Sequence, residues 1–286
     1  MVTKLPAMAR TTALQKLKCR QADIRHESVE EIAGKEFVIW FSARSGSTWL
    51  GSLLFSAGFP KPEEYFHPNK VVRRAAYLGV NSWPDYVRAI KQKRTVSGLF
   101  CHEMTFQFWN ILKKDGDAMN YLDFSGPSVV LFREDIVLQA VSLFLAMNSQ
   151  KWHKYQGSNV PAAVSEVAYS ENAIRKNVEY LLALENGLNK NRDELIRNAR
   201  YVSYECLIRQ SNESIIDAFS RHAGFEARAG VSVRSHYTRM RTTKNLQMSE
   251  RFVENNRQWV AEINDSRNWI FSAMENSPLI VKQAMD

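Results

Sequence analysis

A short polar segment, Arg44-Ser45-Gly46-Ser47-Thr48, has the residue types of a phosphate-binding loop. Gly46 lets the backbone approach an anion closely, and the hydroxyl groups add hydrogen-bond donors. The Arg44 guanidinium supplies a cation for a charged ligand group. If this loop joins a buried strand to a helix, backbone N–H groups and the positive helix end converge there as well. The segment therefore favours a phosphate-binding site, although a plain polar turn before a helix has the same composition.

A second cationic position, Arg133, ends an apolar run and precedes an apolar helix that contains Ser142. An arginine at the end of a buried strand is a natural anion clamp, because its planar fork can bind two oxygens at once. The alternative is structural: Arg133 pairs with Glu134 or Asp135, and Ser142 bonds its own helix. With the first loop in the same chain, we favour the ligand-binding interpretation.

Adjacent carboxylates at Glu63 and Glu64 offer a general base for a hydroxyl substrate. The aromatic residues that follow, Tyr65 and Phe66, can partly desolvate such a carboxylate. A solvated loop after Pro62 is the alternative. Three histidines are further candidates for proton handling or acceptor contact: His67, His102 and His153. Four aromatic residues could stack on a sugar ring, although most tryptophans should lie in the core: Tyr65, Phe66, Trp152 and Tyr155.

Two longer motifs resemble the Stf0-type bacterial sulfotransferases, the family named for trehalose 2-sulfotransferase. The first is Phe41-Ser42-Ala43-Arg44-Ser45-Gly46-Ser47-Thr48, followed by Pro62-Glu63-Glu64-Tyr65-Phe66. The second is Leu131-Phe132-Arg133-Glu134-Asp135, which continues through Gln139-Ala140-Val141-Ser142 to Trp152. The similarity extends from about Phe37 to about Trp259, and these two motifs are its specific part.

The resemblance implies a sulfuryl donor, 3′-phosphoadenosine 5′-phosphosulfate (PAPS), and assigns roles to residues. By it, Arg44, Ser45, Gly46, Ser47 and Thr48 bind the 5′-phosphosulfate, and Arg44 also acts in catalysis. Arg133 and Ser142 hold the 3′-phosphate, and Glu64, directly before the aromatic pair, is the general base. Weaker likeness adds further donor-site residues: Tyr204, Arg239, Arg241 and Lys244. The predicted acceptor site comprises Glu63, Tyr65, Phe66, His67 and Trp152.

One segment departs from the family pattern. Around residues 96–107 the family usually shows Gly-x-Lys before apolar and Trp residues, whereas this chain reads Ser97-Gly98-Leu99-Phe100-Cys101-His102-Glu103. No lysine role can therefore be carried over to this segment, and this departure bears on the acceptor side of the site.

The elements that must position these residues alternate between strands and helices. Apolar runs predict buried strands at Glu36–Ser42, Ser128–Phe132 and Ala199–Ser203. Helical spacing follows each: Thr48–Ala57 with Gly58 behind it, Asp135–Gln150, and Asn212–His222 before Gly224. Glu171–Asn191 reads as a long amphipathic helix, and Ser249–Glu275 as largely helical. This alternation predicts an α/β fold, a P-loop-like sulfotransferase fold with a central, mostly parallel sheet flanked by helices.

Composition narrows the partners and the compartment. The chain has 286 residues, 45% hydrophobic, and a formal charge of +8 that attracts anions. No nucleic-acid module and no apolar run long enough for a transmembrane segment is seen. The basic start of the chain lacks a secretory h-region, and three widely spaced cysteines suit a reducing compartment, so a cytoplasmic protein is expected. We expect residues 1–35 to be a basic N-terminal arm and 36–286 a single sulfotransferase domain.

These observations together predict in-line sulfuryl transfer from PAPS to a hydroxyl of a carbohydrate or glycolipid, with a carboxylate base and no metal. Two alternatives stay open. A P-loop kinase-like ATP-dependent phosphotransferase is disfavoured, because the Walker A loop requires a lysine after its second glycine and no lysine follows Gly46. A non-catalytic protein that binds PAPS or another anion is the other, and a homodimer is left open as well.

Overall fold

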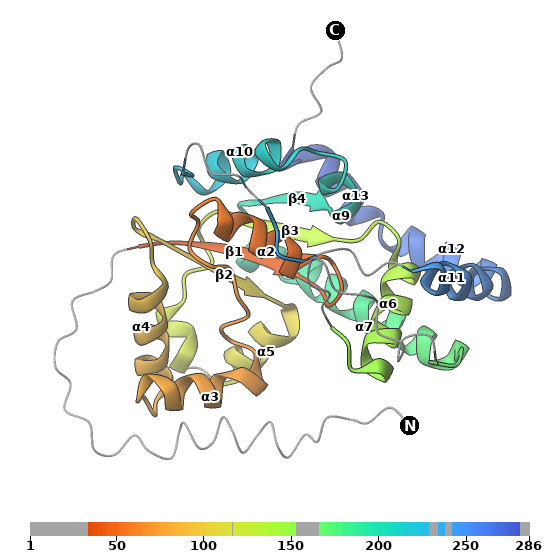
Figure 1. Cartoon of the computed structure of the whole chain (residues 1–286), viewed down its shortest axis with the longest axis horizontal. Helices are drawn as coiled ribbons and strands as arrows, with labels where there is room; N and C mark the ends of the chain where they lie inside the picture. The colour runs from red at the N-terminus through yellow and green to blue at the C-terminus, as the bar shows by residue number, and fades with distance from the viewer. Residues whose placement is uncertain (1–33, 116, 153–165, 229–233, 238–241, 281–286) are drawn as a thin grey trace, which may run out of the picture.

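The computed structural model describes residues 34–115, 117–152, 166–228, 234–237 and 242–280. At its centre lies a parallel sheet with the strand order β2-β1-β3-β4 (Figure 1). The strands are β1 (Lys35–Phe41), β2 (Leu99–Met104), β3 (Ser128–Phe132) and β4 (Ala199–Ser203). Nearly every strand residue is buried, as expected for a sheet that helices cover on both faces. The predicted α/β fold with a parallel sheet is therefore confirmed.

One face of the sheet is covered by helices from the middle of the chain. These are α3 (Pro68–Leu78), α4 (Trp83–Arg94), α5 (Phe106–Asp115), the short η1 (Asp117–Tyr121) and α8 (Arg192–Leu195), with α13 (Asn268–Asn276) from the C-terminal end. Their apolar residues join Val38 and Trp40 of β1 in one buried cluster. Apolar burial of this kind stabilises the fold by roughly 25 cal/mol per Å² and fixes the sheet as a rigid platform.

The opposite face packs against α2 (Ser47–Ser56), α9 (Tyr204–Leu207) and α10 (Asn212–Ala223). A third cluster joins α6 (Ile136–Ser149), α7 (Glu171–Lys190), α11 (Thr243–Asn255) and α12 (Arg257–Ser266), which lie beyond the strand ends in Figure 1. Because α2 follows β1 and α6 follows β3, both helices begin at the carboxyl edge of the sheet. In parallel α/β sheets this edge is where ligands bind.

The predicted elements match the structure closely where apolar runs are uninterrupted. The strands Ser128–Phe132 and Ala199–Ser203 have the predicted bounds, and Asp135 caps α6 through Leu138 N at 2.8 Å. Strand β2 was not predicted, because His102 and Glu103 interrupt its apolar pattern. Both are buried in the structure, so this edge strand contains two ionisable side chains that sequence patterns treat as surface residues.

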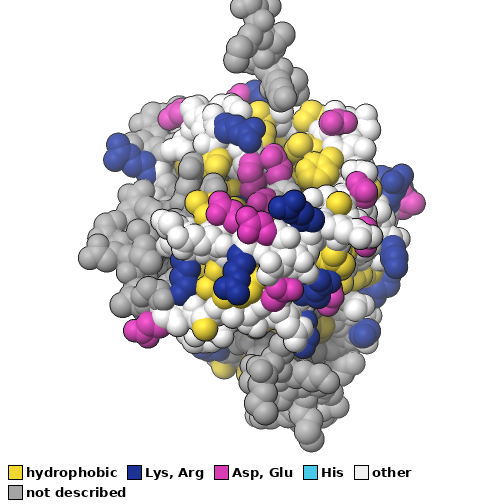
Figure 2. Space-filling view, turned by 90° about the vertical axis from the view of Figure 1, so that its right-hand side faces the viewer, with side chains coloured by type: hydrophobic (Ala, Val, Ile, Leu, Met, Phe, Trp, Pro, Cys, Tyr) yellow, Lys and Arg dark blue, Asp and Glu magenta, His cyan; other side chains and the backbone are white. Residues whose placement is uncertain are grey.

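The surface shows how the net charge is distributed. On the face seen in Figure 2, Lys and Arg side chains are interspersed with Asp and Glu side chains, several of which gather near the centre. This face therefore presents mixed charge and not a basic stripe. Among the described residues, no helix is long and apolar enough to cross a membrane.

Candidate functional site

The loop between β1 and α2 has a backbone shaped for close approach to a ligand. Arg44 and Gly46 have positive φ angles of 67° and 92°. A Cβ on Gly46 would lie 2.4 Å from the Tyr204 ring, so only glycine fits there. Gly46 is the N-cap of α2 and has no side chain to cap the first turn, which leaves backbone N–H groups of that turn for another acceptor. The loop thus has the open, positively polarised helix start that anion sites use.

One buried polar group in this loop has no protein partner in the described part of the chain. Ser45 is fully buried, and its hydroxyl has no hydrogen-bond partner there. Gln139 of α6 donates to Ser42 Oγ and to the Ala43 carbonyl, both at 2.8 Å, and so fixes the start of the loop. An unsatisfied buried hydroxyl costs free energy unless a ligand meets it. These features fit the predicted phosphosulfate loop.

Arg44 reaches from the loop toward α6. Its Nε donates to Ser142 Oγ at 3.1 Å, and its Nη1 donates to the Trp152 carbonyl. The structure therefore brings Arg44 of the first motif together with Ser142 and Trp152 of the second. Burial, and then the nearby charge of Arg133, lower the pKa of Arg44 to about 10. The guanidinium still carries its charge at neutral pH, in a partly desolvated position where it attracts anions strongly.

Arg133 lies on the other side of the same loop. Its Nη1 is 3.4 Å from the Arg44 carbonyl, and its guanidinium stacks 4.6 Å above the Tyr204 ring. Glu205 accepts from Arg133 Nε at 2.7 Å and from Glu134 N at 2.9 Å. With Arg44 and Arg133 against one Glu205, this cluster carries a net positive charge. The arrangement is a two-cation site held in place by a carboxylate.

A buried ion pair supports the turn that carries Arg133. Arg267 is fully buried and binds both carboxylate oxygens of Glu185, at 2.7 and 3.0 Å. Its two Nη atoms donate to the carbonyls of Arg133 and Glu134, at 2.5 and 2.9 Å. One guanidinium therefore joins α7, the start of α13 and the carboxyl end of β3.

The Pro62–Phe66 segment lies along the β2 edge of the sheet, where the Glu63 carbonyl accepts from Glu103 N at 3.0 Å. Glu63 is paired with Arg74 Nη2 at 2.8 Å and with Lys61. Desolvation raises the pKa of Glu63, but the hydrogen bond and charge of Lys61, with Arg74, outweigh it, so the pKa is lowered. Glu63 is thus an ion-paired carboxylate.

Glu64 has looser partners than its neighbour. Lys70 Nζ is 3.5 Å from Oε1, and His67 Nε2 is 3.8 Å from Oε2. His67 Nδ1 accepts from Asn69 N at 3.1 Å, so the proton of the neutral ring lies on Nε2, facing Glu64. Burial lowers the pKa of His67, although Glu64 opposes this effect. Glu64 keeps 22% of its side chain exposed and remains accessible to a substrate.

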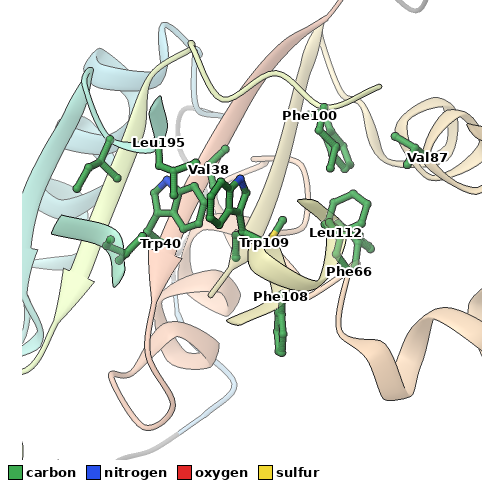
Figure 3. Close-up of a cluster of buried hydrophobic side chains, with 14 of the residues drawn as sticks. Val38, Trp40, Phe66, Val87, Phe100, Phe108, Trp109, Leu112 and Leu195 are labelled. Atoms are coloured by element: carbon green, nitrogen blue, oxygen red, sulfur yellow. The ribbon is translucent and has the colours of Figure 1, made fainter. Parts of the chain in front are cut away.

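Tyr65 and Phe66 are core residues, which corrects the prediction that their rings contact the acceptor. They are 0% and 1% exposed. Figure 3 shows Phe66 within the cluster that includes Phe100 and Leu112. The Tyr65 hydroxyl donates to the Lys61 carbonyl at 2.8 Å. Their packing anchors the segment and so places Glu64.

The remaining predicted residues include His102, Trp152 and Lys244. His102 is fully buried, 3.3 Å from Glu36 Oε2, and its ring packs against those of Phe66 and Phe100. Trp152 is 40% exposed, and its carbonyl accepts a hydrogen bond from Arg44. Lys244 lies in the first turn of α11. Several predicted positions lie outside the described residues: the N-terminal arm up to residue 33, His153, Tyr155, Arg239 and Arg241.

Four residues at this site were given no role from the sequence: Glu103, Gln139, Glu205 and Arg267. Gln139 stands inside the second motif and Glu205 directly follows Tyr204 in the sequence, so proximity to Ser142 and Tyr204 was an available signal. Arg267 offered none, because its contacts form only in the folded chain. In the described part of the chain, no group of three or more His, Cys, Asp or Glu residues could hold a metal ion.

Comparisons with known proteins bear on this site. No curated protein sequence matches the chain. A crystal structure of retinol dehydratase in complex with androsterone and inactive cofactor PAP matches with 11% identity and a TM-score of 0.33. That match covers 94% of this chain and 88% of the other, and it is too distant to carry a conclusion. The model of the Stf0 sulphotransferase family matches residues 36–255, from β1 through α11. This match confirms the resemblance seen in the two motifs: the chain belongs to the Stf0 sulphotransferase family.

Proposed function

We propose that this sulfotransferase moves a sulfuryl group from PAPS to a hydroxyl of a carbohydrate or glycolipid acceptor, in line, with Glu64 as the general base. The observation that carries the proposal is the meeting of Arg44, Arg133 and Ser142 beside an uncapped helix start. Two anion-binding motifs from distant parts of the sequence form one site, as a nucleotide with phosphates at both ends requires. A cytoplasmic location is part of the proposal.

The donor site divides between the two motifs. PAPS, when bound, would supply a sulfuryl group on a good phosphate leaving group. The loop residues Ser45, Gly46, Ser47 and Thr48 and the first N–H groups of α2 would bind its 5′ end. Arg133 and Ser142 would bind the 3′-phosphate, and the Tyr204 ring contacts both Arg133 and the loop at Gly46.

Arg44 has a place in both halves of the site. Its backbone belongs to the loop, whereas its side chain lies against Ser142. We assign it the neutralisation of charge that grows on the leaving phosphate, because a preorganised, partly desolvated cation acts most strongly there. Arg239 and Arg241 are proposed as further donor contacts from the resemblance alone.

Glu64 suits general-base work better than Glu63 for a geometric reason. Glu63 is held by Lys61 and Arg74, so its oxygens are occupied. Glu64 has longer contacts, to Lys70 at 3.5 Å and to His67 at 3.8 Å, which leaves oxygen lone pairs for an acceptor hydroxyl. Glu63, His67 and Trp152 are proposed to border the acceptor. A homodimer and the absence of a required metal remain predictions.

Arg133→Ala should lower affinity for 3′-phosphoadenosine 5′-phosphate (PAP) by about 2 kcal/mol more than it lowers affinity for AMP. The reason is that only PAP carries the 3′-phosphate that Arg133 is proposed to bind. Isothermal titration calorimetry with both nucleotides measures the difference.

The variant leaves Glu205 unpaired, and its charge would repel either nucleotide. The double variant Arg133→Ala/Glu205→Gln removes that charge, and Arg200→Ala, an exposed arginine on β4, is the matched control. Equal losses for PAP and AMP in the double variant would contradict the assignment of Arg133.

A further inference from the structure

Glu103 is a buried carboxyl group directly beneath the phosphate-binding loop. It is the second-last residue of β2 and only 4% exposed. Its Oε1 would lie 2.9 Å from a Cβ on Gly51, so the carboxyl packs against the α2 backbone. Its side chain lies close enough to interact with Ser47, the first residue of α2. Its backbone N–H donates to the Glu63 carbonyl at 3.0 Å. Glu103 therefore connects the loop to the segment that carries Glu64.

The charges around Glu103 disfavour its ionised form. Glu63 and Glu64 face it from the 61–66 segment, Lys70 from α3, and the buried thiol of Cys101 from its own strand. No ion pair to Glu103 is formed by the described residues. Desolvation, followed by the charge of Glu64, raises its pKa well above the usual carboxyl range, with Lys70 and Ser47 opposing. A buried carboxyl in this setting keeps its proton.

We propose that Glu103 is a positioning residue that acts as a neutral carboxylic acid and orients Ser47 for the bound donor. This inference rests on the proposed function, because the ligand of the loop is taken to be the donor. The Glu103 O–H donates to Ser47 Oγ, which leaves the Ser47 hydroxyl proton for an oxygen of the anion. Ionised Glu103 can only accept, so it turns that proton away and places a negative charge beneath the anion site.

The protonation state is tested by unfolding in denaturant from pH 5 to 9, with Glu103→Gln beside the wild type. A carboxyl whose pKa rises on folding contributes stability that is lost as pH increases from its unfolded to its folded pKa. The folding constant of the wild type should therefore fall by up to about tenfold per pH unit relative to Glu103→Gln. Glu179→Gln, an exposed glutamate on α7, should run parallel to the wild type. Parallel profiles for wild type and Glu103→Gln would overturn the neutral assignment.

The positioning role is tested by PAP affinity over pH 7 to 9, below the range in which Arg44 loses its charge. Over this range Glu103→Gln, which keeps a donor at the same place, should bind PAP at least as tightly as the wild type, whose carboxyl gains a negative charge wherever it ionises. Glu103→Met, which removes the donor, should bind PAP more weakly than Glu103→Gln at every pH.

Equal PAP binding by the Gln and Met variants would overturn the positioning role. If neither the wild type nor any variant binds PAP at any pH, the proposed function is wrong, and so is the role of Glu103 in donor binding. The denaturation profiles need no ligand, so they separate that failure from a wrong protonation state.

Discussion

Glu64→Gln should lower turnover by roughly 10²- to 10⁴-fold while leaving PAP affinity close to that of the wild type. The amide keeps the size of the side chain but cannot accept the proton of the acceptor hydroxyl. The segment that contains Glu64 is held by the backbone hydrogen bond from Glu103 N to the Glu63 carbonyl. The substitution does not change that bond, so the loss of function should be confined to the chemical step. Steady-state transfer from PAPS, together with calorimetric titration of PAP, measures both quantities.

Glu63→Gln is the matched control for this prediction. It changes the same residue type one position earlier, where the carboxylate is paired with Lys61 and Arg74. A much smaller loss of turnover is expected. Near-normal rates in Glu64→Gln would mean that the proton goes elsewhere, and His67 would be the next residue to test.

Arg267→Ala should destabilise the protein by about 3–5 kcal/mol, because it leaves the Glu185 carboxylate buried without a partner. It also removes two donors from the carbonyls of Arg133 and Glu134. The free energy of unfolding in urea gives the size of the loss. PAP affinity should fall as well, since the turn that carries Arg133 loses its support.

The double variant Arg267→Met/Glu185→Leu separates charge from packing. Replacing a buried ion pair by apolar residues of similar size is often neutral for stability, so most of the lost free energy should return. Weakened PAP binding should persist, because the Met side chain cannot hold the two carbonyls. A loss below about 1 kcal/mol in Arg267→Ala would contradict this role of the ion pair.

Local sequence patterns were sufficient for the parts of the fold that are apolar and continuous. Strand β3 and the cap of α6 at Asp135 follow from residues adjacent in sequence. Strand β2 could not be found in this way, because the burial of His102 and Glu103 depends on helices from other parts of the chain. The periodicity of an amphipathic or apolar segment contains no information about such partners.

The candidate site was predictable in its residue types and less so in its geometry. Arg44, Arg133 and Ser142 were each expected to bind anions, and the structure brings them together. The orientation of Arg44 toward Ser142 depends on its left-handed backbone, which sequence does not show for a non-glycine residue. Tyr65 was expected at the acceptor because aromatic rings often line sugar sites, but its ring is buried in the core.

Wild-type protein titrated with PAP, AMP and ATP, with and without Mg²⁺, tests the central claim most directly. Thermal unfolding reports binding, because a ligand at 100 times its Kd adds about 2.7 kcal/mol to stability. If the donor site binds both the 3′- and the 5′-phosphate of the nucleotide, PAP should give the largest rise in unfolding temperature, independent of Mg²⁺. AMP and ATP should give a smaller rise. A rise that is largest with ATP and requires Mg²⁺, or equal rises with PAP and AMP, would contradict it.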